Sequence, residues 1–235
     1  MLVDRGFAES LEKATALVLA GAVRVNGQRL EKPGHAVTED AVVEVTQKLR
    51  YVSRGGLKLE GALDTFAIDP TGMTCLDIGS STGGFTDCLL QRGALRVYAI
   101  DSGTSQLDWR IRNDARVLVK EKYNARHLKG ADFPGLVGLL VCDVSFISVM
   151  LVLPPAQALL QDDAQMVILI KPQFEASREQ VGKGGIVRDP LVHREVCTRI
   201  ETFVQAKLGF AHTRIIDSPI LGAEGNQEFL LHARH

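Results

Sequence analysis

The stretch LDIGSSTGGF, Leu76 to Phe85, runs from an apolar segment into a glycine-rich turn, and it decides the fold. Turns of this kind commonly cradle phosphate. A dinucleotide fingerprint needs G-x-G-x-x-G, whereas the glycines here are spaced G-x-x-x-G-G. A P-loop needs a lysine at the position that Phe85 occupies. The turn keeps the backbone freedom of glycine without a phosphate-binding cation, so we expect a nucleoside ligand that carries no phosphate there.

From residue 57 onward, helical patterns alternate with apolar strands, which is typical of an α/β fold with a parallel sheet and helices on both faces. We predict strands at about 73–78, 96–101, 116–119, 137–143, 165–171, 213–217 and 227–232. Open parallel sheets bind ligands outside the carboxyl ends of their strands. We therefore expect a Rossmann-like domain whose polar strand ends converge on one crevice, namely Asp77 with Gly79, Asp101, Asp143 and Lys171.

The apolar segment from Leu136 to Leu153 is long enough to suggest a membrane span. Asp143 lies inside it, and a carboxylate at the bilayer centre costs about 2.5–3.5 kcal/mol. We interpret the segment instead as a buried strand that ends near Asp143, followed by a loop and a helix that opens at Pro154-Pro155.

Composition indicates an ordinary protein with a full core, since 46% of the 235 residues are hydrophobic. The formal net charge is −1, so a nucleic-acid partner would have to be met by local basic patches. The four cysteines form no C-x-x-C pair and the histidines show no metal spacing, so we expect reduced, mostly buried thiols and no metal. The N-terminus lacks the basic-then-apolar pattern of a signal peptide, and we expect a cytoplasmic protein without a membrane partner.

Residues 1–48 predict a small helix-plus-hairpin module. Ser10 is placed to cap a helix that Gly21 stops. In VRVNGQRL, Asn26 and Gly27 predict a type I′ hairpin turn, and AVVEV predicts a further strand.

A basic linker over residues 49–56 joins this module to the domain at 57–235. The run KLRYVSRGGLKL surrounds one aromatic ring with cations, which suits a phosphate backbone beside a stacked base. The residues assigned to RNA binding are Lys48, Arg50, Tyr51 and Arg54. A solvated interdomain linker is the alternative interpretation of each charge.

Asp101 follows Gly79 by 22 residues, at the end of RVYAID, where a carboxylate can accept both hydroxyls of a ribose. Beside a glycine turn without cations it indicates a nucleoside site, and S-adenosylmethionine is the commonest cofactor of that description. Asn124 could read an adenine edge or could be an ordinary turn residue. The predicted cofactor-binding residues are Asp77, Gly79, Ser80, Ser81, Thr82, Gly83, Gly84, Phe85, Asp101, Asn124 and Asp143.

Motifs spread over nearly the whole chain resemble the TlyA or haemolysin-A family, relatives of FtsJ-like ribose methyltransferases. They are RYVSRGGLKLEGAL, LDIGSSTGGFTDCLL, TSQLDWRIR, CDVSFIS, LIKPQFEA, GKGGIVRD and GNQEFLL. The resemblance implies an RNA-binding domain like that of ribosomal protein S-four over residues 1–48, and an FtsJ-like methyltransferase domain at 57–235. The chain starts at Met1-Leu2-Val3, inside what is normally the first helix of that RNA-binding domain, so we expect a domain that is N-terminally truncated relative to the family.

The resemblance also implies S-adenosylmethionine-dependent methyl transfer to a ribose 2′-hydroxyl of ribosomal RNA. The family's Lys-Asp-Lys-Glu tetrad falls on Lys58, Asp143, Lys171 and Glu228. A ribose hydroxyl is a weak nucleophile, so a neutral amine beside it can take its proton as the methyl group is attacked. We assign this role to Lys171, with the two carboxylates orienting the lysines and favouring the charge that is gained.

Each tetrad member has an ordinary structural alternative. Lys58 could be a solvated helix lysine, and Glu228 could be the polar side of an edge strand. Asp143 and Lys171 end strongly apolar runs, where an unpaired charge is costly, so a functional role fits them better. For the whole protein, the alternatives are an RNA-binding protein with an inactive enzyme domain and a cytolysin. We predict the enzyme, with ribosomal RNA or ribosomal subunits as its substrate.

Overall fold

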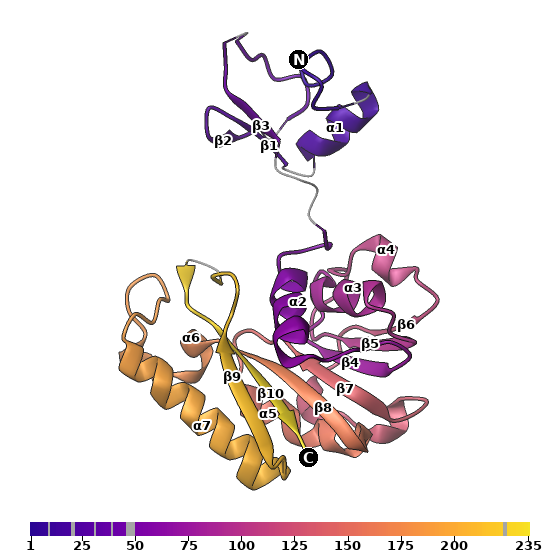
Figure 1. The fold of residues 1–235 in the computed structure, drawn as a ribbon, viewed down its shortest axis with the longest axis vertical. Helices are drawn as coiled ribbons and strands as arrows, with labels where there is room; N and C mark the ends of the chain where they lie inside the picture. Colours follow the sequence, from indigo (N-terminus) through magenta and orange to yellow (C-terminus); the bar gives the residue numbers. More distant parts are fainter. Residues whose placement is uncertain (9, 20–21, 31, 39, 46–49, 223–224) are drawn as a thin grey trace. The chain divides into compact units, whose positions relative to one another are not determined.

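A seven-stranded sheet with the order β6-β5-β4-β7-β8-β10-β9 organises the larger of two units, Tyr51–His235, in this computed structural model (Figure 1). The smaller unit is Met1–Arg50. The structure describes residues 1–8, 10–19, 22–30, 32–38, 40–45, 50–222 and 225–235.

The strands of the larger unit confirm most of the predicted pattern. They are β4 (Thr74–Ile78), β5 (Arg96–Ile100), β6 (Val117–Lys120), β7 (Val137–Cys142), β8 (Leu160–Ile170), β9 (His212–Asp217) and β10 (Phe229–Arg234). Only β8 departs from its predicted bounds by more than two residues, because it begins at Leu160 instead of about residue 165. Near its start, β8 carries the exposed polar side chains of Gln161, Asp162 and Asp163. Because this run is not apolar, the sequence pattern did not indicate a strand there.

The predicted parallel sheet is confirmed for five strands, and β10 departs from it. Strands β4 to β8 pair in parallel, but β10 runs antiparallel to both of its neighbours, β8 and β9. No crossover helix lies in the described residues between β9 and β10, 218–222 and 225–228, and the chain returns beside β9 in the opposite direction. Phe229 pairs with Ile170, and the start of β10 therefore lies at the carboxyl edge of the parallel strands.

Helices cover both faces of the sheet, as the alternating pattern predicted (Figure 1). They are α2 (Gly55–Phe66), α3 (Gly84–Gln91), α4 (Trp109–Arg112), α5 (Val149–Ala156), α6 (Pro172–Glu175) and α7 (Pro190–Leu208). Successive strand residues face opposite sides. Leu76 joins the core under α5 and α7, whereas Cys75 joins the core under α2 and α3. Burial of each large apolar side chain in these cores contributes about 1.5–3 kcal/mol.

Helix α5 begins at Val149, five residues before the predicted opening at Pro154-Pro155, so that prediction was wrong. Ser148 Oγ accepts the N–H of Met150 at 3.2 Å and starts the helix. Both prolines lie in the last turn of α5, so the helix ends at Ala156, one residue after them. The segment before α5 is the predicted buried strand, β7. Within the described residues, no helix combines the length and the apolar character needed to cross a membrane.

The smaller unit has the predicted helix, hairpin and further strand. They are α1 (Leu11–Leu19), β1 (Val23–Val25), β2 (Gln28–Arg29) and β3 (Val43–Val45), and the sheet order is β2-β1-β3. Asn26 and Gly27 have φ values of 51° and 77°, as the type I′ turn requires. The predicted helix stop, Gly21, lies outside the described residues.

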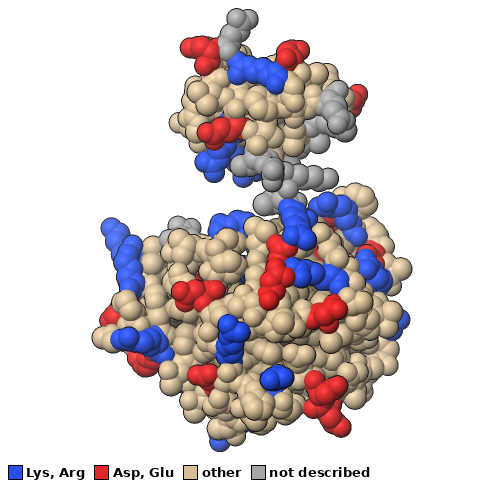
Figure 2. Space-filling view, in the orientation of Figure 1, with Lys and Arg blue, Asp and Glu red and all other residues tan. Residues whose placement is uncertain are grey.

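Charges and thiols follow the expectations from composition. On the face shown in Figure 2, acidic and basic side chains are interspersed over both units. All four cysteines are free thiols, and Cys75, Cys88 and Cys142 are buried.

Candidate active site

The glycine turn after β4 lets separate parts of the chain approach one another closely. Gly79 has a φ of 85°, and a Cβ there would collide with the carbonyl oxygen of Asp143, which follows β7. A Cβ on Gly84 would collide with Ser53 Oγ, just before α2. The two glycines therefore allow the ends of β4 and β7 to meet the start of α2.

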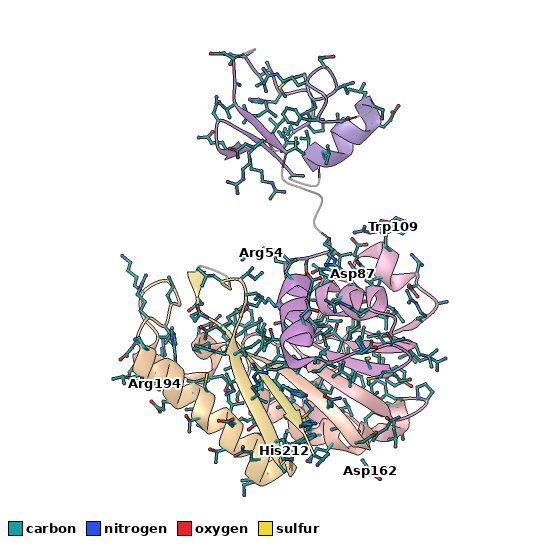
Figure 3. The ribbon with its side chains drawn as sticks, in the orientation of Figure 1. Arg54, Asp87, Trp109, Asp162, Arg194 and His212 are labelled. Atoms are coloured by element: carbon teal, nitrogen blue, oxygen red, sulfur yellow. The ribbon has the colours of Figure 1, made fainter. Side chains whose placement is uncertain are left out.

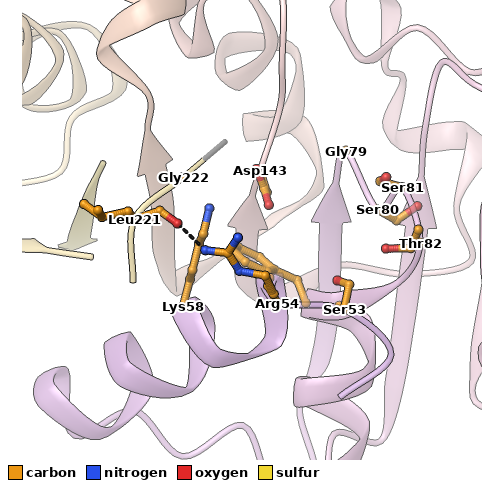
Figure 4. Close-up of a pocket in the computed structure, with 13 residues that line it drawn as sticks. Ser53, Arg54, Lys58, Gly79, Ser80, Ser81, Thr82, Asp143, Leu221 and Gly222 are labelled. Atoms are coloured by element: carbon orange, nitrogen blue, oxygen red, sulfur yellow. Dashed lines mark hydrogen bonds between the residues drawn. The ribbon is translucent and has the colours of Figure 1, made fainter. Parts of the chain in front are cut away.

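A pocket, here called the catalytic pocket, lies between this turn and the start of α2. Figure 4 shows Lys58 on α2 and Asp143 beyond the end of β7 at this pocket. The predicted cofactor residues that line it are Gly79, Ser80, Ser81, Thr82, Gly84, Phe85 and Asp143.

A second pocket, here called the nucleoside pocket, adjoins the first and shares Gly79, Ser81 and Asp143 with it. Two carboxylates, those of Asp101 and Asp143, line it beside the apolar side chains of Ile78, Ile100, Val144, Ile147 and Val152. Among the described residues that line it there is no lysine or arginine. The pocket thus suits a neutral or cationic ligand with an apolar ring, in line with the expectation of a nucleoside without phosphate.

The two predicted adenosine contacts, Asp101 and Asn124, differ in the hydrogen bonds that they already form. Asp101 accepts the N–H of Ser81 at 2.8 Å through Oδ2 and the N–H of Gly103 at 2.7 Å through Oδ1. Each of these oxygens has the capacity to accept a further hydrogen bond. Asn124 also lines the pocket, but its Oδ1 accepts the N–H of Arg126 at 3.1 Å and caps a short 3₁₀ helix. The described contacts of Asn124 are therefore those of a turn residue.

Asp77, in β4, and Gly83, in the glycine turn, line neither pocket. Asp77 is fully buried, and its Oδ2 accepts the hydroxyl of Thr86 at 2.6 Å. Its Oδ1 has no hydrogen-bond partner in the part of the chain that the structure describes. Burial raises the pKa of Asp77 to about 7, against the hydrogen bond from Thr86 and with a further rise from the charge of Asp143.

The four tetrad residues form two ion pairs. Lys58 Nζ pairs with Glu228 Oε2, and Lys171 Nζ lies 2.5 Å from Asp143 Oδ1. Lys171 also donates to Ser145 Oγ at 2.9 Å. Lys58 and Asp143 line the catalytic pocket, whereas their partners Glu228 and Lys171 do not.

Neither ordinary alternative agrees with the burial of the first pair. Lys58 is 8% exposed and Glu228 is 2% exposed, so they are not a solvated lysine and the polar side of an edge strand. A Cβ on Gly222 would collide with Glu228 Oε1, so this glycine lets the preceding loop pass closely over the carboxylate. Two buried charges in contact are expected where a site needs fixed charges.

Phe146 belongs to the site but had no signal in the sequence beyond its place in CDVSFIS. It lines the nucleoside pocket, is 90% exposed and has a φ of 65°, which is unusual for a bulky residue. Its ring lies 4.9 Å from that of Phe174 in α6. A strained backbone therefore presents an aromatic ring to solvent beside Asp143.

The prediction of Tyr51 as an RNA-stacking ring was wrong. Tyr51 is 2% exposed, and its ring packs so closely on Gly56 that any Cβ there would overlap it. The Tyr51 hydroxyl donates to Glu60 at 3.1 Å, and the N–H of Val52 donates to Asp87 at 2.8 Å. The segment that starts at Tyr51 is therefore part of the larger unit's core and not a solvated linker.

The predicted basic residues of this segment have different surroundings. Arg54 donates to the carbonyl oxygen of Leu221 at 2.6 Å and lines the catalytic pocket. Figure 3 shows Arg54, Asp87 and Trp109 at the same end of the larger unit. Arg50 is exposed, and Lys48 lies outside the described residues.

Two family profiles match the chain. One, described as FtsJ-like methyltransferase, matches residues 51–235, and the other, described as S4 domain, matches residues 1–43.

Named relatives cover nearly the whole chain. The Bacillus subtilis protein YqxC is 50% identical over 99% of this chain and 83% of its own length. The Mycobacterium tuberculosis protein TlyA, named a 16S/23S rRNA (cytidine-2′-O)-methyltransferase, is 46% identical over 99% of this chain and 87% of its own length. A Brachyspira hyodysenteriae protein named hemolysin A is 43% identical over 97% of this chain and 95% of its own length.

A solved Streptococcus thermophilus structure is 46% identical and superimposes with a TM-score of 0.79, over 99% of this chain and 86% of the other. The sheet, the profile matches and these relatives agree with one another. The chain belongs to the family of FtsJ-like methyltransferases that carry an S4 domain, the family of TlyA and hemolysin A.

Proposed function

We propose that the protein transfers a methyl group from S-adenosylmethionine to a ribose 2′-hydroxyl of ribosomal RNA. The observation that carries the proposal is the position of the Lys171–Asp143 pair beside the junction of the two pockets. The name of TlyA from Mycobacterium tuberculosis, with 46% identity to this chain, supports the same reaction.

The nucleoside pocket fits S-adenosylmethionine by its charges. The carboxylate of Asp101 suits the two ribose hydroxyls, and the apolar wall suits adenine. Asp143, which lines both pockets, suits a sulfonium. When bound, S-adenosylmethionine supplies an electrophilic methyl group.

Lys171 is proposed as the base that receives the hydroxyl proton at Nζ. Asp143 and Ser145 hold that nitrogen by contacts of 2.5 and 2.9 Å, so its position is fixed before the acceptor arrives. The ammonium that forms lies against the Asp143 carboxylate, which stabilises the charge. Lys58 also lines the catalytic pocket, and the Lys58–Glu228 pair is proposed to orient the acceptor ribose.

The RNA acceptor is supported by features outside the chemistry. Residues 1–43 match the S4 domain, and we assign RNA binding to this unit. The exposed ring of Phe146 suits stacking on a nucleobase beside the pocket, where base–aromatic contacts are worth about 1–3 kcal/mol. We assign catalysis to the unit that starts at Tyr51.

The test is methyl transfer from isotopically labelled S-adenosylmethionine to purified ribosomal RNA, followed by mapping of the labelled riboses. We expect label at defined 2′-hydroxyls with the wild type and none with Asp143→Asn. A protein that binds both cofactor and RNA without transferring label would be an RNA-binding protein with an inactive domain. Leakage of dye-loaded liposomes without cofactor would instead support the cytolysin alternative.

A further inference from the structure

A short exposed loop between α6 and α7 carries two cations that have no role in the site described above. This loop, Gly182–Arg188, is here called the basic loop, and its cations are Lys183 and Arg188. Both side chains are exposed, and neither makes an ion pair with a residue that the structure describes. Figure 2 shows basic side chains projecting from this loop at the upper left of the larger unit.

The backbone of the basic loop is shaped to leave space at its tip. Gly184 and Gly185 have φ values of 77° and 74°, and no atom lies within 4 Å of a Cβ built on either. A bridge between Gly182 and Ile186 closes the loop at its base. A turn of this kind presents a bare backbone between two cations.

The basic loop is tied to the catalytic edge by Asn226. This side chain is 3% exposed, its Oδ1 accepts the N–H of Val187 at 3.1 Å, and its Nδ2 donates to Gly185 O at 3.0 Å. Two residues further on, Glu228 forms the buried pair with Lys58. The loop is therefore held at a fixed place relative to the catalytic residues.

The carboxylates nearest in sequence are mostly engaged elsewhere. Asp189 accepts the N–H of Leu191 at 2.8 Å and caps α7, and Glu195 accepts from Gln180 at 3.1 Å. Glu179 is exposed within the short 3₁₀ helix that the Ser177–Gln180 capping box starts. None of these three carboxylates forms a described ion pair with Lys183 or Arg188, so both cations can still contact a ligand.

We infer that the basic loop binds the phosphate backbone of the RNA substrate, as a second contact in addition to the S4 unit. The inference rests on the proposed function for the identity of the polymer. Lysine and arginine neutralise phosphates without reading sequence, and such contacts set register and orientation. Because Asn226 fixes the loop relative to Glu228, a phosphate held there would align the strand with the catalytic pocket.

The test compares two double variants of the full chain that remove the same charge. Lys183→Ala/Arg188→Ala removes the loop cations. The control, Arg96→Ala/Lys207→Ala, removes two exposed cations at the opposite edge of the sheet, at the start of β5 and in the last turn of α7. Affinity for ribosomal RNA is measured over a range of salt concentrations, with cofactor affinity and thermal midpoint as checks of folding.

We expect the loop variant to bind RNA about tenfold more weakly, with a salt slope reduced by about 1–2. Its KM for RNA should rise while kcat at saturating RNA stays near the wild-type value, and the control should change neither quantity. Equal affinity and equal slope in the two variants, with an active wild type, would overturn the inference and leave the proposed function standing. A wild type that does not bind ribosomal RNA would overturn both.

Discussion

Lys171 Nζ lies 2.5 Å from Asp143 Oδ1, and the two residues follow directly after β8 and β7, which are neighbours in the sheet. The pair is therefore positioned by the sheet itself and not by a loop. Asp143 faces both pockets, so any group bound at their junction lies close to the lysine. The chemistry proposed for the protein depends on this contact.

Replacement of Lys171 tests its role as a base. Lys171→Ala should bind cofactor and RNA nearly as well as the wild type but lose about 10²–10⁴-fold in the rate of methyl transfer. Lys171→Arg should be equally slow, because a guanidinium does not release its proton near neutral pH. Single-turnover rates with saturating RNA measure both effects. An active arginine variant would contradict base catalysis, and loss of binding would indicate a structural role.

Asp101 should contribute to cofactor affinity. Asp101→Ala should lose about 1.5–3 kcal/mol of binding free energy for S-adenosylmethionine, the usual value of hydrogen bonds to a charged group. Calorimetry without RNA measures this loss. Asp114→Ala, which removes an exposed carboxylate paired with Arg116, serves as the control and should leave the affinity unchanged. Unchanged affinity in Asp101→Ala would show that this residue only orders the adjoining loops.

Asp77 should make the fold less stable as pH rises. Burial raises its pKa from 3.8 to about 7, so between these values the unfolded chain releases a proton that the folded chain keeps. Stability is therefore lost as pH rises from about 4 to about 7, by an amount on the order of 4 kcal/mol.

The variant Asp77→Asn removes this titration and should keep an acceptor for the Thr86 hydroxyl. Thermal midpoints at pH 5 and pH 8, without cofactor, should fall less in Asp77→Asn than in the wild type. The same fall in both proteins would mean that Asp77 is ionised in the fold throughout this range.

Removal of the smaller unit should affect RNA and not cofactor. A chain that starts at Tyr51 should bind ribosomal RNA more weakly and with a smaller salt slope, because fewer phosphates are neutralised. A chain that starts at Gly56 should also be less stable, since it loses the buried ring of Tyr51 and the bond from Val52 to Asp87. Salt-dependent binding and thermal melting separate the two effects. A salt slope that does not change on removal of residues 1–50 would contradict the assignment of RNA binding to this unit.

Local pattern was enough to predict the parts of the site that lie on single strands. Two features could be recognised from short stretches of sequence, namely the glycine spacing from Gly79 to Gly84 and the acidic residue Asp101 after β5. In the structure, Gly79 and Asp101 both line the nucleoside pocket. The reversed direction of β10 depends on pairing between distant segments, which no local pattern records. The prediction of an exposed Tyr51 ring was wrong because it relied on the charged residues beside it in the sequence. In the structure, the ring is buried against Gly56. The positive φ and the exposure of Phe146 have no local signal in the sequence.

The most direct test of the central claim is methyl transfer to ribosomal RNA in which the target nucleotide carries a single 2′-deoxy sugar. The account predicts that labelled methyl groups pass to the unmodified RNA and that the single deoxy substitution abolishes transfer at that position, while RNA affinity changes little. Methylation that survives the substitution would place the acceptor on a base and would contradict transfer to the ribose hydroxyl.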